Sequence, residues 1–152
     1  MFEIIIVTHG TLSDGFKDAV NTIIGQSKNI KTINLLSGKS IENLKDKILK
    51  TVEEADNETN EETGVIIFTD LVSASPYNQS ILAIKEVDLN FQDKVYVVGG
   101  VNLPMVLEAV NHQILGTNIH ETIDSITSQG KESIGYWNIN QLDFNLEDED
   151  EF

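Results

Sequence analysis

Residues 3–16, EIIIVTHGTLSDGF, decide the fold. The first part, residues 3–7, is a short apolar run rich in β-branched side chains, without the alternation of a strand that has one exposed face. We therefore expect a strand buried on both faces, as in a parallel sheet. The run ends at His9 and Gly10, after which Ser13 is expected to cap a helix. A buried strand, a turn and an amphipathic helix together form the repeating unit of α/β sheets.

The same alternation continues along the chain. Strands are expected at residues 30–36, 64–69, 95–98 and 134–137, and the later helices are expected to begin after Ser40, at Pro76, at Pro104 and after Asn118, with the last ending near Gly130. Uninterrupted apolar strands between amphipathic helices predict a single doubly wound α/β domain, with a mainly parallel sheet and helices on both faces. The common strand order for such a domain is 2-1-3-4. We expect the domain to span residues 1–137 and an acidic tail to follow at residues 138–152.

The composition is that of an ordinary globular protein. Its 152 residues suffice for one core, and 40% of them are hydrophobic. No window approaches the roughly 18 apolar residues of a membrane span, and the first residues do not resemble a basic leader. Cysteine is absent, which excludes disulfides and thiolate metal sites. We therefore expect a cytoplasmic protein.

The charge is strongly negative and includes no arginine. The formal net charge is −15, and all ten cations are lysines. This balance argues against nucleic acid and anionic membranes as partners. It also excludes enzymes that grip phosphate with guanidinium clamps, because such bidentate contacts need arginine. Six carboxylates and no base fall in the last ten residues, which predicts a solvated, disordered tail.

The chemistry is expected where strands end and helices begin. In open parallel sheets, sites form beyond the carboxyl ends of the strands, and helix N-termini there favour anions. Three loops qualify: residues 8–13 (THGTLS), 70–76 (DLVSASP) and 99–104 (GGVNLP). His9 and Asp70 end the first and third strands, which are neighbours in the order 2-1-3-4. A carboxylate that accepts the Nδ1 proton of a neutral imidazole leaves Nε2 with a free lone pair.

Such a histidine can act as a general base, a metal ligand or a nucleophile. A metal is least expected, because His112 and His120 fall on the surface of later helices and no ligand cluster is visible; no cofactor is expected either. Triad hydrolysis would need a G-x-S-x-G turn, which the chain lacks. A phosphohistidine phosphatase or mutase would want arginine around its phosphate. A histidine nucleophile that accepts a phosphoryl group remains.

Three segments resemble one known family together. VTHG, FTDLVSASPYN and VVGGVNLPM, in this order, resemble the EIIA domain of the mannose family of the bacterial phosphoenolpyruvate:sugar phosphotransferase system, over about residues 2–137. The resemblance implies that His9 takes a phosphoryl group from HPr and passes it to a histidine of an EIIB component, which serves a membrane sugar permease. It implies that Asp70 orients His9. It also implies that Ser75 holds the phosphoryl oxygens. Gly10 and Ser73 are further candidates for contact with the phosphoryl group, Ser73 through its hydroxyl.

The resemblance also implies a homodimer and marks one departure. The family typically exchanges a C-terminal strand between two subunits, and residues 133–137 are the candidate strand here. The family usually has two glycines before the serine that matches Ser75, whereas this chain has Ser73 and Ala74. Glycine lets a backbone approach a phosphate closely, so the change bears on transfer or on partner fit.

Three alternatives therefore stay open. The first is a regulatory module in which His9 phosphorylation is a signal without onward transfer. The second is the related phosphocarrier subunit that feeds dihydroxyacetone kinase. The third is a plain α/β binding domain in which the histidine is structural.

Overall fold

The computed structural model describes residues 1–27, 29–57 and 63–141. The strands are β1 (Glu3–His9), β2 (Ile30–Leu35), β3 (Val65–Thr69) and β4 (Val95–Val98). The helices are α1 (Leu12–Ile24), α2 (Ile41–Asn57), α3 (Ser75–Ile84), α4 (Leu103–Leu115) and α5 (Ile119–Glu132), with short 3₁₀ turns η1 (Gln92–Lys94) and η2 (Ile139–Gln141). Within these residues no helix is both long and apolar enough to cross a membrane.

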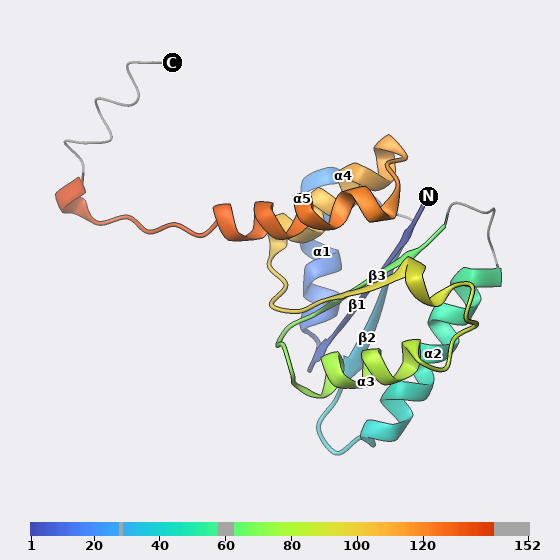
Figure 1. Ribbon diagram of the computed structural model, residues 1–152. Helices are drawn as coiled ribbons and strands as arrows, with labels where there is room; N and C mark the ends of the chain where they lie inside the picture. Colours follow the sequence, from blue (N-terminus) through green and yellow to red (C-terminus); the bar gives the residue numbers. More distant parts are fainter. Residues whose placement is uncertain (28, 58–62, 142–152) are drawn as a thin grey trace.

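The four strands form one parallel sheet in the order β2-β1-β3-β4, which confirms the predicted topology (Figure 1). In its register, His9 pairs with Leu35 of β2, and Val7 pairs with Thr69 of β3. The carboxyl ends of β1, β2 and β3 therefore meet at one edge of the sheet. The loops after these three strands start from that edge.

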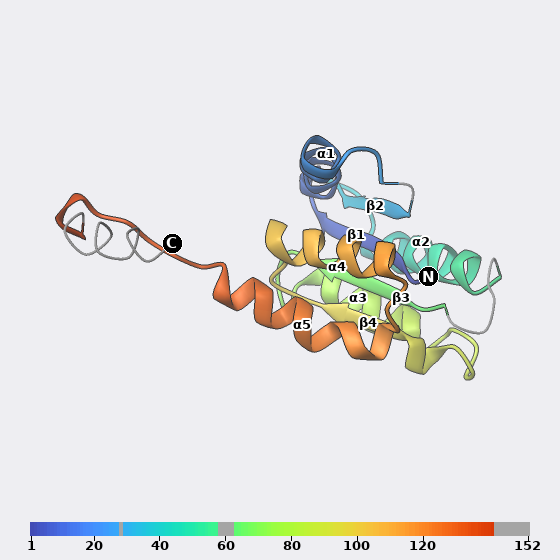
Figure 2. The same ribbon diagram turned by 90° about the horizontal axis from the view of Figure 1, so that it is seen from above.

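Helices cover both faces of the sheet, as expected (Figure 2). One core contains Ile4, Ile6 and Phe68 and includes residues of α1, α4 and α5. The other contains Ile5 and Val7 of the same β1 strand and includes residues of α2 and α3. Successive side chains of a strand point to opposite faces, so β1 supplies both cores and needs no polar alternation. This explains why the apolar run in residues 3–7 is continuous.

The expected cap of α1 at Ser13 is wrong. The helix begins at Leu12. Thr11 takes the N-cap position, but its side chain makes no capping hydrogen bond. Ser13 is instead buried, and its backbone N–H donates to the Thr8 hydroxyl at 2.8 Å. The free N–H of the first turn is therefore satisfied from the end of β1. This contact fixes the His9–Thr11 turn between the strand and the helix.

Other helix boundaries differ from the prediction by one or two residues. Ser75 is the first residue of α3 and Pro76 the second, with Ala74 at the N-cap. Pro104 is likewise the second residue of α4, after an Asn102 cap. Asn118 caps α5 as expected, but the helix continues past Gly130 to Glu132. In α3 and α4, the proline has no N–H to lose in the first turn, so either of the first two helical positions suits it.

The expected strand at residues 134–137 is not formed in the single chain. These residues are extended without strand pairing, and they run away from the rest of the domain (Figures 1 and 2). Ile134 is 78% exposed, Tyr136 86% and Trp137 58%. A strand needs a neighbour for its backbone groups, and among the residues that the structure describes this segment pairs with no strand. The acidic tail lies mainly outside the described residues, which end at Gln141.

Candidate functional site

The candidate site is a histidine–aspartate pair at the carboxyl edge of the sheet. His9 is the last residue of β1, and Asp70 directly follows β3. Because β1 and β3 are adjacent and parallel, their ends lie side by side, which brings together two residues 61 positions apart in the sequence. The predicted juxtaposition of imidazole and carboxylate is therefore present.

One carboxylate oxygen of Asp70 contacts both the backbone N–H and the ring of His9. Asp70 Oδ2 accepts the backbone N–H of His9 at 3.0 Å and lies 2.8 Å from His9 Nδ1. The other oxygen, Oδ1, accepts the backbone N–H of Leu71 at 3.0 Å. With Asp70 ionised, the ring nitrogen that faces it is the donor, so Nδ1 carries the proton. Nε2 then has its lone pair free.

The surroundings keep the Asp70 carboxyl ionised. Partial burial acts to raise its pKa, but the hydrogen bonds from the ring and the backbone of His9 outweigh burial, and the pKa of Asp70 is lowered below its ordinary value. The side chain of Asp70 is only 13% exposed, whereas that of His9 is 46% exposed. The anchoring group is therefore shielded, while the ring that it orients is open to a partner.

The loop after β3 adopts a turn that side chains rarely take. Ser73 has a positive φ of 64°, in the left-handed region that favours glycine. Its carbonyl accepts a hydrogen bond from the side-chain amide of Asn78 at 3.0 Å, which holds the turn against α3. Asn78 thus ties the left-handed turn at Ser73 to the first turns of α3.

Ser75 stands at the start of α3. The first backbone hydrogen bond of the helix runs from Asn78 N–H to the Ala74 carbonyl at 2.9 Å. The N–H groups of Ser75 and Tyr77 precede it and have no partner within the helix, while Pro76 has no N–H to offer. Free N–H groups at the positive end of a helix favour an anion. Ser75 is only partly buried, so an anion can reach it from solvent.

The loop after β4 supports the loop after β3. The Val101 N–H donates to the carbonyl of Thr69 at 3.0 Å. A Cβ added to Gly99 would lie 2.5 Å from the side chain of Val72, so only glycine lets the two loops approach this closely. Asn102 caps α4 by accepting the Met105 N–H at 3.1 Å. The described contacts give this loop a supporting role, and they do not place it against His9.

An open hollow of about 450 Å³ lies beside His9. It is lined by His9, Gly10, Leu35, Leu36, Ser37, Lys39 and Ile41. The Gly10 N–H already donates to the Leu35 carbonyl at 2.9 Å. Ser73 and Ser75 do not line this hollow. Of the three expected contact residues, only Gly10 lines the hollow with His9.

Sequence reasoning missed the β2–α2 loop, which contributes Ser37 and Lys39 to this hollow. The strand order contained the signal. In the order 2-1-3-4, β1 has β2 on one side and β3 on the other, so the loop after β2 must border His9 as closely as the loop after β3 does.

The other two histidines lie away from this edge. His120 is exposed on α5, and its Nδ1 lies 2.6 Å from the hydroxyl of Tyr96. His112 is half-buried between α4 and α5, where its ring contacts Glu108 at 3.1 Å, so the expectation of a surface residue is wrong for His112. Among the described residues, no group of three or more histidines and carboxylates could hold a metal ion.

Comparison with known proteins gives a consistent result. The family profile EIIA-man, described as "PTS system fructose IIA component", matches residues 3–127. The chain is 36% identical, over 113 residues, to the sorbose-specific EIIA component of a phosphotransferase system from Lacticaseibacillus casei, and the match covers 72% of each chain.

Solved structures share the fold. The phosphotransferase component EIIA from Streptococcus agalactiae superimposes with a TM-score of 0.78 at 26% identity, covering 90% of this chain and 97% of the other. A mannose/sorbose-specific IIA subunit from Enterococcus faecalis gives a TM-score of 0.75 at 18% identity, covering 90% and 95%. The second likeness concerns the fold alone.

Proposed function

Because this chain belongs to the mannose-type EIIA family of the sugar phosphotransferase system, we propose that it is a phosphoryl carrier that uses His9 as its acceptor. The donor is a phosphohistidine of HPr, and the next acceptor is a histidine of an EIIB component. The observation that carries the proposal is the contact of 2.8 Å between His9 Nδ1 and Asp70 Oδ2. In the neutral ring this contact places the proton on Nδ1 and leaves the Nε2 lone pair free, on a side chain that is 46% exposed.

The proposed step is an in-line displacement at phosphorus. The Nε2 lone pair of His9 forms the new N–P bond while the N–P bond of the donor breaks, and the donor imidazole keeps the electron pair of that bond. The proton on Nδ1 of His9 stays in place. Since one phosphohistidine is made and another is consumed, the step is reversible. The same displacement, with a histidine of EIIB as the nucleophile, then removes the phosphoryl group from His9.

Asp70 has two roles in this proposal. It holds the ring in one orientation, so that Nε2 points to solvent before a partner arrives. It also stabilises the positive charge that develops on the ring as the N–P bond forms, since its carboxylate stays ionised. Asp70 thus acts on the reacting ring by direct contact.

The moving phosphoryl oxygens need donors, and this chain has no arginine to supply them. We assign this role to the backbone and hydroxyl groups at Ser73 and Ser75. We place the phosphoryl group beside Gly10, which lines the hollow with His9 but whose own N–H already donates to the Leu35 carbonyl. The uncapped first turn of α3 supports the assignment of Ser75. The left-handed turn at Ser73 supports a loop whose backbone groups face outward.

The proposed partners follow from the charge and from the C-terminal segment. A net charge of −15 suits a basic face on HPr, which raises the rate of encounter at low salt. The exposed apolar side chains of residues 134–137 support a homodimer in which this segment pairs with a second copy. A cytoplasmic location, next to a membrane sugar permease, belongs to the same proposal.

One observation favours a second candidate, a regulatory module. Ser73 and Ala74 stand where the family usually has two glycines, and Ser73 takes a left-handed φ that costs more for serine than for glycine. In a regulatory module, His9 would be phosphorylated but would not pass the group onward. Transfer to EIIB therefore separates the two candidates.

The deciding experiment is an intact-mass measurement. The full chain is incubated with phosphoenolpyruvate, enzyme I and HPr, beside His9→Ala and a His120→Ala control. We expect one acid-labile phosphoryl group in the natural chain and in His120→Ala, and none in His9→Ala. No gain in the folded natural chain with an active HPr, or a gain in His9→Ala, would refute the proposal. Adding EIIB to the phosphorylated chain then tests onward transfer.

A further inference from the structure

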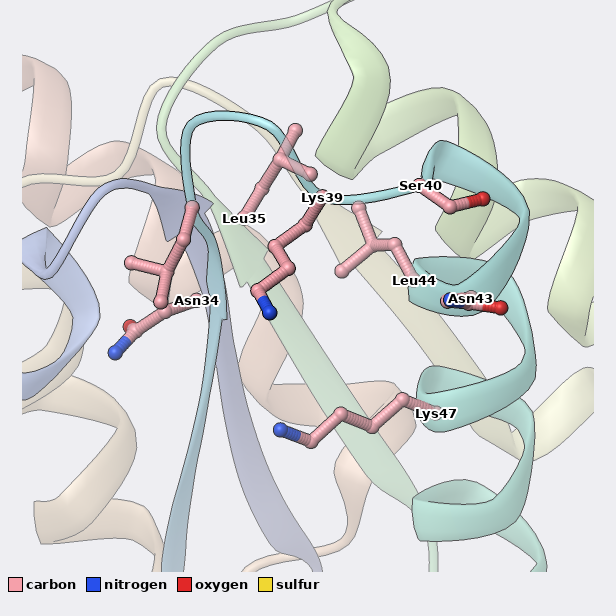
Figure 3. Close-up of a pocket in the computed structure, with 8 residues that line it drawn as sticks. Asn34, Leu35, Lys39, Ser40, Asn43, Leu44 and Lys47 are labelled. Atoms are coloured by element: carbon pink, nitrogen blue, oxygen red, sulfur yellow. The ribbon is translucent and has the colours of Figure 1, made fainter.

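A second hollow lies between β2 and the start of α2 (Figure 3). Its volume is about 210 Å³, and it is lined by Asn34, Leu35, Leu36, Lys39, Ser40, Asn43, Leu44 and Lys47. It shares Leu35, Leu36 and Lys39 with the hollow beside His9, but His9 does not line it. The function proposed for His9 makes no use of this second hollow.

Two ammonium groups converge in this hollow. Lys39 reaches in from the loop after β2, and Lys47 reaches in from α2 on the opposite wall (Figure 3). The chain has ten lysines against 25 carboxylates, so two facing lysines concentrate positive charge on a negative protein. Lys31 and Lys45 pair with Glu3 and Glu86, whereas no ion pair joins Lys39 or Lys47 within the described part of the chain.

One carboxylate that Lys47 acts on is already engaged by other groups. Asp14, on α1, accepts hydrogen bonds from Thr32 Oγ1 at 2.6 Å and from the Asn34 amide at 2.7 Å. Its pKa is lowered, first by the Thr32 bond, then by the Asn34 bond, with a smaller contribution from Lys47. Asp14 therefore offsets part of the charge of Lys47, but its carboxylate already accepts hydrogen bonds from Thr32 and Asn34 of β2.

The floor of the hollow is apolar. Leu44 is 4% exposed and Leu35 is partly buried against the core under α2 and α3. An apolar surface lowers the local dielectric, which strengthens attraction between an ammonium group and an anion above it. The volume is below the roughly 300–1,000 Å³ of sites for drug-sized ligands. Only a small anion fits.

We propose that this hollow is a binding site for a small phosphate monoester, with the phosphate between Lys39 and Lys47 and a short carbon chain over Leu35 and Leu44. Two ammonium groups match the two negative charges of a phosphate monoester near neutral pH, and lysine binds phosphate as a point charge. The six N–H donors of the pair suit three phosphate oxygens better than a single carboxylate. The proposal is independent of phosphorylation at His9.

The test is a titration of the ¹⁵N-labelled full chain with glycerol 3-phosphate and, in parallel, with inorganic phosphate, followed by ¹H–¹⁵N NMR at constant ionic strength. We expect saturable shifts that centre on residues 36–47. Lys39→Gln and Lys47→Gln should each weaken binding at least fivefold. Lys50→Gln removes the same charge from an exposed position of α2 outside the hollow, and should leave binding within twofold.

His9→Ala separates this site from the candidate phosphorylation site. The variant should bind glycerol 3-phosphate as tightly as the natural chain, whether or not His9 accepts a phosphoryl group. Shifts that stay linear with concentration, an equal loss in Lys50→Gln, or shifts that centre on Gly10 and Leu71 and vanish in His9→Ala would each overturn the proposal. Glycerol 3-phosphate should bind more tightly than inorganic phosphate, because only the ester contacts the leucines.

Discussion

Replacing Asp70 with asparagine tests the mechanism most directly. Asp70→Asn keeps the size and one acceptor oxygen of the side chain but removes its negative charge. In the natural chain, Oδ2 accepts both the backbone N–H and Nδ1 of His9, at 3.0 and 2.8 Å. The substitution therefore leaves the fold intact and weakens the group that faces the developing charge.

The magnitude follows from that contact. A hydrogen bond to a charged group is worth about 1.5–3 kcal/mol more than none, and each 1.36 kcal/mol changes a rate tenfold. If the carboxylate stabilises the ring mainly in the transition state, phosphorylation of His9 should slow by about 10- to 150-fold. Because the His9 side chain is 46% exposed, the loss in unfolding free energy should be smaller, about 1 kcal/mol or less.

The assay is rapid-quench transfer from phosphorylated HPr, read by intact mass, with Asp18→Asn as the control. Asp18 is an exposed carboxylate on α1, so this variant has the same change in net charge without a contact to His9. A rate for Asp70→Asn within twofold of the natural chain, or an equal loss in Asp18→Asn, would refute the role given to Asp70. Urea unfolding of each variant checks that the fold is retained.

Three further outcomes are expected. The folded pKa of Asp70 is lowered, so its stabilisation is complete above the unfolded value near 4 and is lost as pH falls through the folded value. The difference in unfolding free energy between the natural chain and Asp70→Asn should therefore shrink as the pH falls below the unfolded value and close once the pH is below the folded value, and a gap that does not shrink in acid would contradict this cause. Gly99→Ala should cost about 1–3 kcal/mol in urea unfolding, because its Cβ would meet Val72 at 2.5 Å. Gly15 lies inside α1, and a Cβ added there would meet no atom within 4 Å, so Gly15→Ala should raise the unfolding free energy by about 0.5–1 kcal/mol. A Gly15→Ala variant less stable than Gly99→Ala would show that crowding of the added Cβ is not the cause. Removing residues 134–152 should convert the proposed dimer to a monomer in light scattering, whereas removing residues 142–152 should not; a full chain that is already monomeric would exclude the exchange.

The parts of the fold that local pattern determines were predictable from the sequence. The strand order and the pairing of His9 with Asp70 follow from uninterrupted apolar strands in βα units, and the structure confirms both. The roles of Gly10, Ser73 and Ser75 stay predictions, since no contact of theirs to a phosphoryl group is present to judge.

The errors arise where a tertiary contact replaces a local one. Ser13 has the residue type of a helix cap, but the Thr8 hydroxyl satisfies its N–H from the preceding strand, and the helix starts two residues earlier than a cap at Ser13 predicts. Residues 134–137 have the composition of a strand, yet strand formation depends on a neighbour that one chain does not provide. The place of Lys39 beside His9 required the strand order to be applied to the loop after β2.

The two contacts between Asp70 and His9, one to the backbone and one to the ring, also constrain the kinetics of any phosphoryl transfer through this site. Asp70 occupies Nδ1 of the ring, so every partner must react with the same nitrogen, Nε2. Donor and acceptor must then approach along the same line, so no ternary complex can form and turnover should follow a ping-pong scheme. An excess of unphosphorylated HPr would accordingly inhibit transfer to EIIB by occupying the only approach to the ring.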